Sequence, residues 1–173
     1  MQEQLCSNPA ADSNSAEPQG LVFDIKRFAI NDGPGLRVTI FLKGCPLSCR
    51  WCHNPESISS HIQKMYSLGK CIACGECVKI CPLEACELTA EGVVTETEVC
   101  SACGMCADVC PAKATEMSGQ YQSVTDLVKI IETERVFFDQ SGGGVTFAGG
   151  EPMMYPEFLN QMLDACGRLE IHR

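Results

Sequence analysis

The chain has 173 residues and a formal net charge of −9, and 45% of its residues are hydrophobic. This length suits one or two small domains, and the apolar content is enough for a real core. The acidic balance argues against a nucleic-acid-binding protein, whose footprint is basic and clustered, and against binding to an anionic membrane surface. No apolar run approaches the roughly 18 residues that a membrane-spanning helix needs.

Residues 1–20 are polar and lack the apolar segment of a secretory signal. We expect them to form a disordered tail. The chain contains 14 cysteines. Without an export signal, this number indicates metal binding in a reducing, cytoplasmic compartment rather than a set of disulfides.

Two strands are predicted next. Residues 21–28 alternate loosely between apolar and polar side chains, as a strand does. Residues 37–42 are a β-branched, apolar run typical of a buried strand, and residues 31–35 between them have the Gly and Pro content of a turn. A cysteine-rich loop follows the buried strand directly, which is typical of the ligand-binding edge of a parallel α/β sheet.

This loop contains three cysteines, Cys45, Cys49 and Cys52, in the spacing C-x-x-x-C-x-x-C. A structural zinc site normally has four ligands, whereas a four-iron cluster held by three cysteines keeps one iron open to another molecule. We therefore favour an open four-iron cluster at this loop. The alternative is a zinc site completed by His53 or His61, which the iron-type cysteine pattern further along the chain disfavours.

Residues 70–116 contain a second cysteine pattern, C-x-x-C-x-x-C-x-x-x-C-P, which occurs twice. It is the bacterial ferredoxin run, in which the fourth cysteine of each run ligates the other cluster. Each expected cluster therefore takes three cysteines from one run and one from the other: Cys71, Cys74, Cys77 and Cys110 for the first, and Cys81, Cys100, Cys103 and Cys106 for the second. The alternative is a degenerate module without clusters, which the presence of all eight ligands and both prolines disfavours.

Residues 117–173 return to an α/β pattern. Ser123, with an acid three residues later, predicts the start of a helix. The Gly-rich stretch 141–144 interrupts the pattern, residues 145–147 predict a short strand, and Pro156 suits the first turn of another helix. A further strand is expected to begin at the last residues of the chain.

Three cysteines are not assigned to a cluster. Cys6 lies in the tail, Cys86 is expected to be a small packing residue, and Cys166 is expected in the core because it lies on an apolar helix face. The three histidines have no paired carboxylate or triad arrangement in the sequence, so we predict that none is a catalytic acid or base.

The order of these motifs resembles the radical S-adenosylmethionine superfamily: a strand, the three-cysteine loop, and Gly149-Gly150-Glu151 after the next strand. Residues 32–37 (DGPGLR) and 41–56 (FLKGCPLSCRWCHNPE) resemble more closely the activating enzymes of glycyl radical enzymes. Many of these have a two-cluster insertion like that at 70–116. The resemblance covers about residues 20–173.

The resemblance implies an α/β fold, namely the N-terminal part of a partial (β/α)6 barrel with an inserted ferredoxin-like module that holds two [4Fe-4S] clusters. The implied domains are a tail at 1–20, the start of the radical core at 21–69, the insertion at 70–116 and an incomplete continuation of the core at 117–173. Only two β/α units are counted, at roughly 30 residues each. We therefore expect a chain that is C-terminally truncated relative to the family.

The family's site residues map onto seven positions here. Those that would hold the catalytic cluster are Cys45, Cys49 and Cys52, and those that would contact S-adenosylmethionine are Trp51, Gly149, Gly150 and Glu151. Trp51 would lie near the adenine, and the Gly-Gly-Glu stretch near the amino end of the ligand, where glycines let the backbone approach closely. Residues 32–37 would border the place where the partner's glycine loop docks. The alternative for these residues is a tight turn before a strand.

The implied activity is that of a radical S-adenosylmethionine oxidoreductase. One electron cleaves S-adenosylmethionine, and the resulting 5′-deoxyadenosyl radical takes a hydrogen from a glycine of a partner glycyl radical enzyme. The implied cofactors are three [4Fe-4S] clusters, one catalytic and two of ferredoxin type, together with S-adenosylmethionine, and the implied electron donor is flavodoxin or ferredoxin. Two alternatives stay open: a non-catalytic ferredoxin-like electron carrier, and a radical enzyme that acts on another protein, such as a sulfatase.

Overall fold

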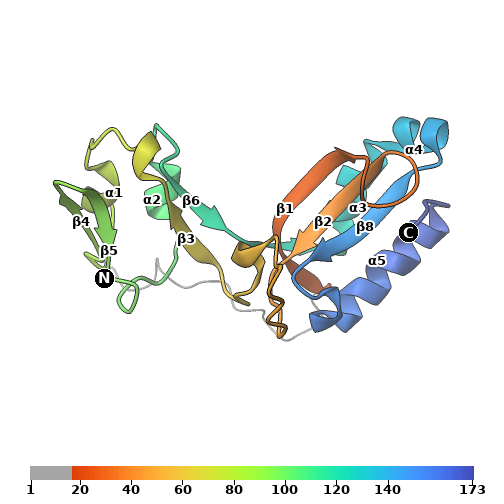
Figure 1. The fold of residues 1–173 in the computed structure, drawn as a ribbon, viewed down its shortest axis with the longest axis horizontal. Coiled ribbons are helices and arrows are strands. Elements are labelled where there is room, and N and C mark those ends of the chain that lie inside the picture. The colour runs from red at the N-terminus through yellow and green to blue at the C-terminus, as the bar shows by residue number, and fades with distance from the viewer. Residues whose placement is uncertain (1–16) are drawn as a thin grey trace. The chain divides into compact units, whose positions relative to one another are not determined.

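The computed structural model describes residues 17–173, which form two compact units (Figure 1). Residues 62–118 make up one unit, which we call the cysteine unit. The other described residues, 17–61 and 119–173, make up the sheet unit. Among the described residues, no helix has the length and the apolar character that crossing a membrane would require.

Most of the expected tail, residues 1–16, lies outside the described residues. Its predicted end at residue 20 is too late, because Gln19 and Gly20 already pair with another strand. The expected start of the insertion at residue 70 also differs from the start of the cysteine unit. This unit begins at residue 62, because a strand before the first cysteine run belongs to it.

The sheet unit is built on four strands in a mixed sheet. In spatial order the strands are β7 (Gln120–Ser123), β1 (Gln19–Ala29), β2 (Arg37–Leu42) and β8 (Gly144–Gly149). β1 is antiparallel to both of its neighbours, whereas β2 and β8 run parallel. The α/β class is confirmed. The partial six-unit barrel stays a prediction, and β2 and β8 would be two of its parallel strands.

Helices cover one face of the sheet. They are α3 (Val124–Glu132), α4 (Arg135–Ser141) and α5 (Pro156–Arg168). Because side chains alternate along a strand, Val38, Ile40 and Leu42 of β2 all point into the apolar core, where Leu127 of α3 and Met162 of α5 are also fully buried. The predicted strands at 21–28 and 37–42 and the helix from Pro156 are confirmed. The sequence did not predict α4.

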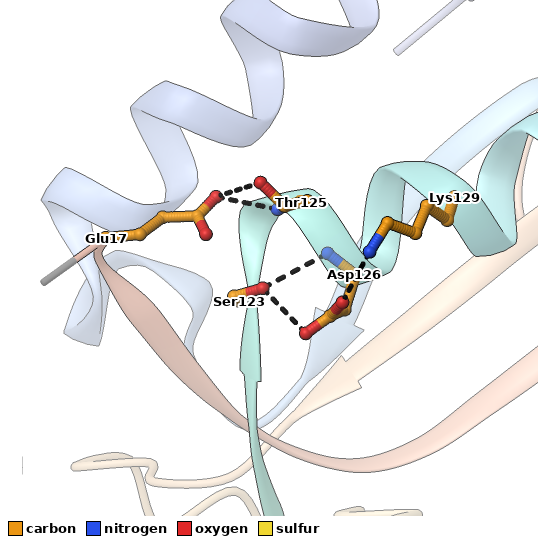
Figure 2. Close-up of polar contacts among 5 residues, drawn as sticks. All are labelled: Glu17, Ser123, Thr125, Asp126 and Lys129. Carbon is orange, nitrogen blue, oxygen red and sulfur yellow. Dashed lines mark hydrogen bonds and ion pairs between the residues drawn. The ribbon is translucent and has the colours of Figure 1, made fainter.

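The start of α3 is capped from two sides (Figure 2). The Ser123 hydroxyl accepts a hydrogen bond from the Asp126 amide at 3.1 Å and donates to the Asp126 carboxylate at 2.9 Å. Glu17 accepts from both the amide and the hydroxyl of Thr125, at 2.7 and 2.8 Å. These bonds satisfy N–H groups that have no partner inside the helix, and they confirm the helix start predicted at Ser123.

A further parallel pairing begins beside β8 at the last residues. His172 forms an isolated parallel bridge with Gly144, and its carbonyl accepts a hydrogen bond from the Val145 amide at 2.8 Å. The predicted start of another strand is therefore confirmed. It extends the parallel part of the sheet on the far side of β8 from β2.

The cysteine unit contains short elements that surround its cysteines. They are β3 (Gln63–Tyr66), α1 (Glu76–Lys79), β4 (Cys86–Thr89), β5 (Gly92–Thr95), α2 (Met105–Asp108) and β6 (Thr115–Ser118). β3 pairs with β6 and β4 with β5, in both cases antiparallel. Its core cluster is made of Cys77, Cys86, Val93 and Cys106, so thiols occupy the place that aliphatic side chains have in the sheet unit.

The sequence repeat in this unit is also a backbone repeat. Three pairs of residues 29 positions apart have positive φ, namely Ala73 and Ala102, Gly75 and Gly104, and Glu84 and Lys113. Positive φ is uncommon outside glycine, so a matched set of such residues indicates one backbone design used twice. Each copy has its one-turn helix, α1 or α2, directly after the repeated glycine.

Candidate metal centres and cofactor site

The three-cysteine loop begins at the carboxyl end of β2 and is anchored by backbone hydrogen bonds. Gly44 donates to the Ser57 carbonyl at 2.7 Å, and Cys45 donates to the Ile58 carbonyl at 3.1 Å. Between these anchors Cys49 and Cys52 are exposed, while Cys45 is half-buried. The loop is thus fixed at its base and presents thiols at its surface.

The Gly149-Gly150-Glu151 stretch lies beside this loop. Gly149 ends β8 opposite Leu42, the last residue of β2. Beyond the sheet, the Gly150 amide donates to the Leu42 carbonyl at 2.7 Å, and the Glu151 amide donates to the Gly44 carbonyl at 2.9 Å. The structure therefore brings together two motifs that are about 100 residues apart in the sequence, at the sheet edge where parallel strands expose ligand-binding loops.

The glycines are required by the fold at this point. A Cβ atom added to Gly150 would lie 2.3 Å from the Gly44 carbonyl oxygen, and Gly149 has φ of +97° with the Leu42 carbonyl oxygen 2.6 Å from an added Cβ. The close approach of the two strand ends thus explains both glycines without a ligand. It also leaves backbone groups, rather than side chains, at the edge of the loop.

The other two residues predicted to contact S-adenosylmethionine differ in their surroundings. The Glu151 carboxylate accepts a hydrogen bond from the Met153 amide at 3.0 Å and so caps the short 3-10 turn Pro152–Met154. Trp51 has 77% of its surface exposed. Its role near the adenine stays a prediction.

Lys43 is a residue of this site that the sequence did not single out. It is fully buried between β2 and Gly44, and its ammonium donates to the Glu56 carbonyl. Burial lowers the pKa of Lys43, and the charge of Glu56 opposes that shift. Because Glu56 follows the cysteine loop, the contact ties the far end of the loop to the end of β2.

The Asp32–Arg37 stretch makes internal contacts at the amino end of β2, the opposite end from the cysteine loop. The Asp32 carboxylate accepts from the Thr39 hydroxyl at 2.6 Å, and the Arg37 Nε donates to the Thr146 hydroxyl at 2.6 Å. Arg37 also contacts the His172 ring nitrogen at 3.1 Å. These contacts favour the tight-turn interpretation of the loop, and a role at the partner's docking site stays a prediction.

The cysteine unit contains two cavities, each lined by four of the predicted ligands. Cavity A is lined by Cys71, Cys74, Cys77 and Cys110. Cavity B is lined by Cys81, Cys100, Cys103 and Cys106. Each set combines cysteines of both runs in the crossed manner that the sequence pattern predicts. Both cavities therefore present four thiols each to a bound group.

The chemistry of the donor set fits iron–sulfur clusters. The Ala85 amide donates to the Cys81 sulfur at 3.3 Å, and 29 residues later the Ala114 amide donates to the Cys110 sulfur at 3.2 Å. Backbone N–H groups aimed at cysteine sulfurs are among the features that set cluster potentials. Among residues 17–173, no three His, Cys, Asp or Glu side chains are placed to hold a single metal ion; a four-iron cluster distributes its four thiolates over four irons.

The pKa values of individual thiols in the two cavities are shifted in different directions. Burial raises the pKa of the Cys77 thiol in cavity A and that of the Cys106 thiol in cavity B. By contrast, hydrogen bonding from the Thr115 amide lowers the pKa of the Cys110 thiol. Ligating thiols must lose their protons, so loading of the buried positions depends on the metal to stabilise the thiolates.

Cys86 also lines cavity B, which the sequence did not predict. It is buried, as expected of a packing residue, but its sulfur accepts a hydrogen bond from the Lys64 ammonium at 3.0 Å. Lys64 donates to the Thr95 hydroxyl as well, at 2.8 Å. Cys166 is fully buried in the core of the sheet unit, as predicted, and Cys6 lies outside the described residues.

Comparison with known proteins adds to this geometry. The family described as "4Fe-4S single cluster domain" matches residues 31–77. The benzylsuccinate synthase activating enzyme of Thauera aromatica is 41% identical over 157 residues, which cover 88% of this chain and 47% of that protein. The trans-4-hydroxy-L-proline dehydratase activating enzyme of Clostridioides difficile is 45% identical over 153 residues, 88% of this chain and 51% of that protein.

A third relative, the choline trimethylamine-lyase activating enzyme of Oleidesulfovibrio alaskensis, is 40% identical over 153 residues, 87% of this chain and 49% of that protein. The chain therefore spans about half the length of the curated relatives it matches. The three identities differ by only a few percentage points, although the partners in the relatives' names carry out different reactions. Overall identity thus does not favour one of these relatives over the others.

Proposed function

We propose that this chain activates a glycyl radical enzyme. Most of its length is similar to activating enzymes of such enzymes. Cys45, Cys49 and Cys52 would hold a four-iron cluster with one open iron. Gly149, Gly150, Glu151 and Trp51 would contact S-adenosylmethionine. When bound, these groups supply a one-electron cleavage of S-adenosylmethionine and a radical that removes hydrogen from a glycine of the partner.

The observation that carries the proposal is the pair of hydrogen bonds beyond the sheet, from Gly150 to Leu42 and from Glu151 to Gly44. They hold the Gly-Gly-Glu backbone next to the base of the cysteine loop, so a ligand on the open iron of a cluster in that loop would lie close to this backbone. The buried Lys43 and its contact with Glu56 keep the loop in position. This chain's own contribution is therefore to fix the distance between the two motifs.

The cysteine unit would supply electrons. Its cavities A and B would each hold a ferredoxin-type cluster, with flavodoxin or ferredoxin as the external donor. This part also supports the second candidate function, an electron carrier without radical chemistry, because the two crossed sets of four cysteines would suffice for it.

Release of 5′-deoxyadenosine separates the two candidates. The full chain is loaded with iron and sulfide under anaerobic conditions, reduced with dithionite and given S-adenosylmethionine. Under the proposed function the product is formed, Cys49→Ala abolishes it, and Cys74→Ala alone retains it because dithionite reduces the catalytic cluster directly. A cluster-loaded chain that releases no 5′-deoxyadenosine would refute the activase proposal for this chain and favour the electron carrier.

A matched pair of glycine variants tests the strand-end contact itself. Gly150→Ala places a methyl group against the Gly44 carbonyl and is expected to lower product release by at least about tenfold, since a displacement of about 1 Å near the reacting groups costs that much or more. Gly69→Ala is the control, because nothing lies within 4 Å of its added Cβ. Equal activity of the two variants would show that the contact does not position the site.

A further inference from the structure

One short strand contributes to both cavities of the cysteine unit. Lys64 of β3 lines cavity B, and Tyr66 of the same strand lines cavity A. Residues two apart on a strand point to the same side of it, so β3 places a different polar side chain beside each cavity. The 29-residue repeat makes the cysteine loops alike, and β3, which precedes the repeat, makes their surroundings unlike.

Lys64 brings a positive charge to cavity B. Its ammonium has three N–H donors, of which two bind the Cys86 sulfur and the Thr95 hydroxyl. The side chain is half-buried in the structure. Burial opposes the charged form, but the hydrogen bond to Cys86 and the nearby thiols together raise the pKa of Lys64. The ammonium therefore stays charged beside the cavity.

Two other lysines of the unit have their charge offset by a carboxylate, and a third, Lys113, is exposed and is not among the residues that line either cavity. Lys79 is 2.7 Å from Glu76, and Lys70 is 3.6 Å from Glu116. Both are exposed, so water and salt screen them further. Lys64 has no carboxylate within ion-pair distance among the described residues, which leaves its charge to act on the groups in cavity B.

Tyr66 brings a neutral group to cavity A. Its hydroxyl accepts a hydrogen bond from the Val93 amide at 3.0 Å. A phenol is a neutral group at neutral pH, because its ordinary pKa is about 10. Of the two side chains that β3 places beside the cavities, the one at cavity B is therefore charged and the one at cavity A is not.

We infer that Lys64 raises the reduction potential of the cluster in cavity B above that of the cluster in cavity A, so that an electron entering the unit rests on cavity B. This inference depends on the ligand assignment proposed above. Reduction adds one negative charge to a cluster without forming or breaking a bond. A nearby fixed positive charge stabilises that charge in a partly buried site, and net charge and hydrogen bonds are known determinants of cluster potential.

The test is a redox titration of the full chain, followed by electron paramagnetic resonance. The chain carries Cys49→Ala, so that only the two clusters of the cysteine unit titrate, and dithionite is the reductant. Cys103→Ala, which removes a ligand of cavity B, identifies the wave of that cluster. Lys64→Met is expected to make reduction of this cluster about tenfold less favourable, which is about 59 mV for one electron, and to leave the other wave in place.

Three variants control for structure and charge. Lys64→Arg keeps the charge and should restore the potential. Lys70→Met removes a lysine of the same unit that is exposed and ion-paired, and it should shift neither wave. Cys86→Ala should retain about eight irons per chain, since cavity B has its four ligands without it, and should retain most of the potential because the ammonium remains.

The outcomes separate this inference from the proposed function. Fewer than about eight irons per chain before any change at Lys64 would refute the ligand assignment. With both clusters present, Lys64→Met would overturn the inference in either of two ways. The cavity B wave could stay unshifted, or the cavity A wave, which is the one that remains in Cys103→Ala, could shift instead. So would loss of cavity B iron in both Lys64→Met and Lys64→Gln, because Lys64 would then be a residue needed for assembly.

Discussion

The sheet unit and the cysteine unit are stabilised in different ways. In the sheet unit, aliphatic side chains of a strand and two helices, such as Ile40, Leu127 and Met162, are completely buried against one another. In the cysteine unit, three of the four residues in the core cluster are cysteines, and the fourth is Val93. The core of the sheet unit consists of protein side chains alone. The core of the cysteine unit is expected to be completed by iron–sulfur clusters.

The cysteine unit is therefore the part of the molecule whose folding is expected to depend on bound clusters. Apolar burial stabilises by roughly 25 cal/mol for each Å² removed from water, and it does so in any redox state. A small unit with few aliphatic side chains lacks that contribution, and in such units the free energy of metal binding is also the free energy of folding. Loss of the clusters is therefore expected to divide the molecule into a folded and an unfolded part.

The largest expected effect is that of removing the clusters. Without iron and sulfide, amide hydrogen exchange in residues 62–118 is expected to become faster by about a hundredfold or more, because opening no longer costs cluster binding energy. Amides of β2 and β8 are expected to keep their protection. Mass spectrometry of peptides from the loaded and the cluster-free chain measures both. Equal loss of protection in the two units would contradict the comparison.

A cavity in the core of the sheet unit is the second test. Leu127→Ala is expected to lower the free energy of unfolding of the sheet unit by about 2–5 kcal/mol, since Leu127 is fully buried. The iron content of the chain should stay unchanged. Val136→Ala is the control: this side chain is 60% exposed on α4, and the change should stay within about 0.5 kcal/mol. Denaturant unfolding of the cluster-free chain, followed by circular dichroism, measures both variants.

The smallest expected effect concerns pH and the start of α3. Hydrogen bonding from Ser123, and then from Lys129, lowers the pKa of the Asp126 carboxyl in the folded chain. Its contribution to stability is therefore complete above the unfolded pKa, about 3.9, and is lost as the pH falls through the lower folded value. In Asp126→Asn this part of the pH dependence should be absent.

Thermal unfolding of the cluster-free chain at pH 7 and at pH 3 provides the measurement. The difference in melting temperature between the wild type and Asp126→Asn should be larger at pH 7 and smaller at pH 3. Asp164→Asn, an exposed change on α5, serves as the comparison and should show no such trend. A constant difference for Asp126→Asn would argue against a charged cap.

Much of this organisation could be predicted from local sequence signals. β2 and β8 are apolar, β-branched strands, and the parallel arrangement of their carboxyl ends brings Gly150 near Cys45. The capping serine marked the start of α3. The 29-residue spacing of the two cysteine runs predicted a structural repeat, which appears in the backbone as matched residues with positive φ.

Other features depend on contacts that the sequence does not encode locally. β7 is a polar four-residue strand, and only its pairing with β1 identifies it. β3 and β6 pair across an intervening 48 residues, between Tyr66 and Thr115. Cys86 accepts a hydrogen bond from Lys64 beside cavity B. Lys64 reaches Cys86 because β3 lies next to the β4–β5 hairpin. A pattern of cysteines alone gives no signal for such a neighbour.

The pairing of Gln63 with Ser118 at the ends of β3 and β6 has a consequence for how such proteins can evolve. The cysteine unit therefore begins and ends at two neighbouring points of the backbone, about 5 Å apart as in any strand pair. A segment whose ends meet in this way can be gained, exchanged or deleted as a cassette, with little disturbance of the host. The paired ends therefore mark where a short turn could replace the whole unit, leaving the cysteine loop and the Gly-Gly-Glu backbone joined as before.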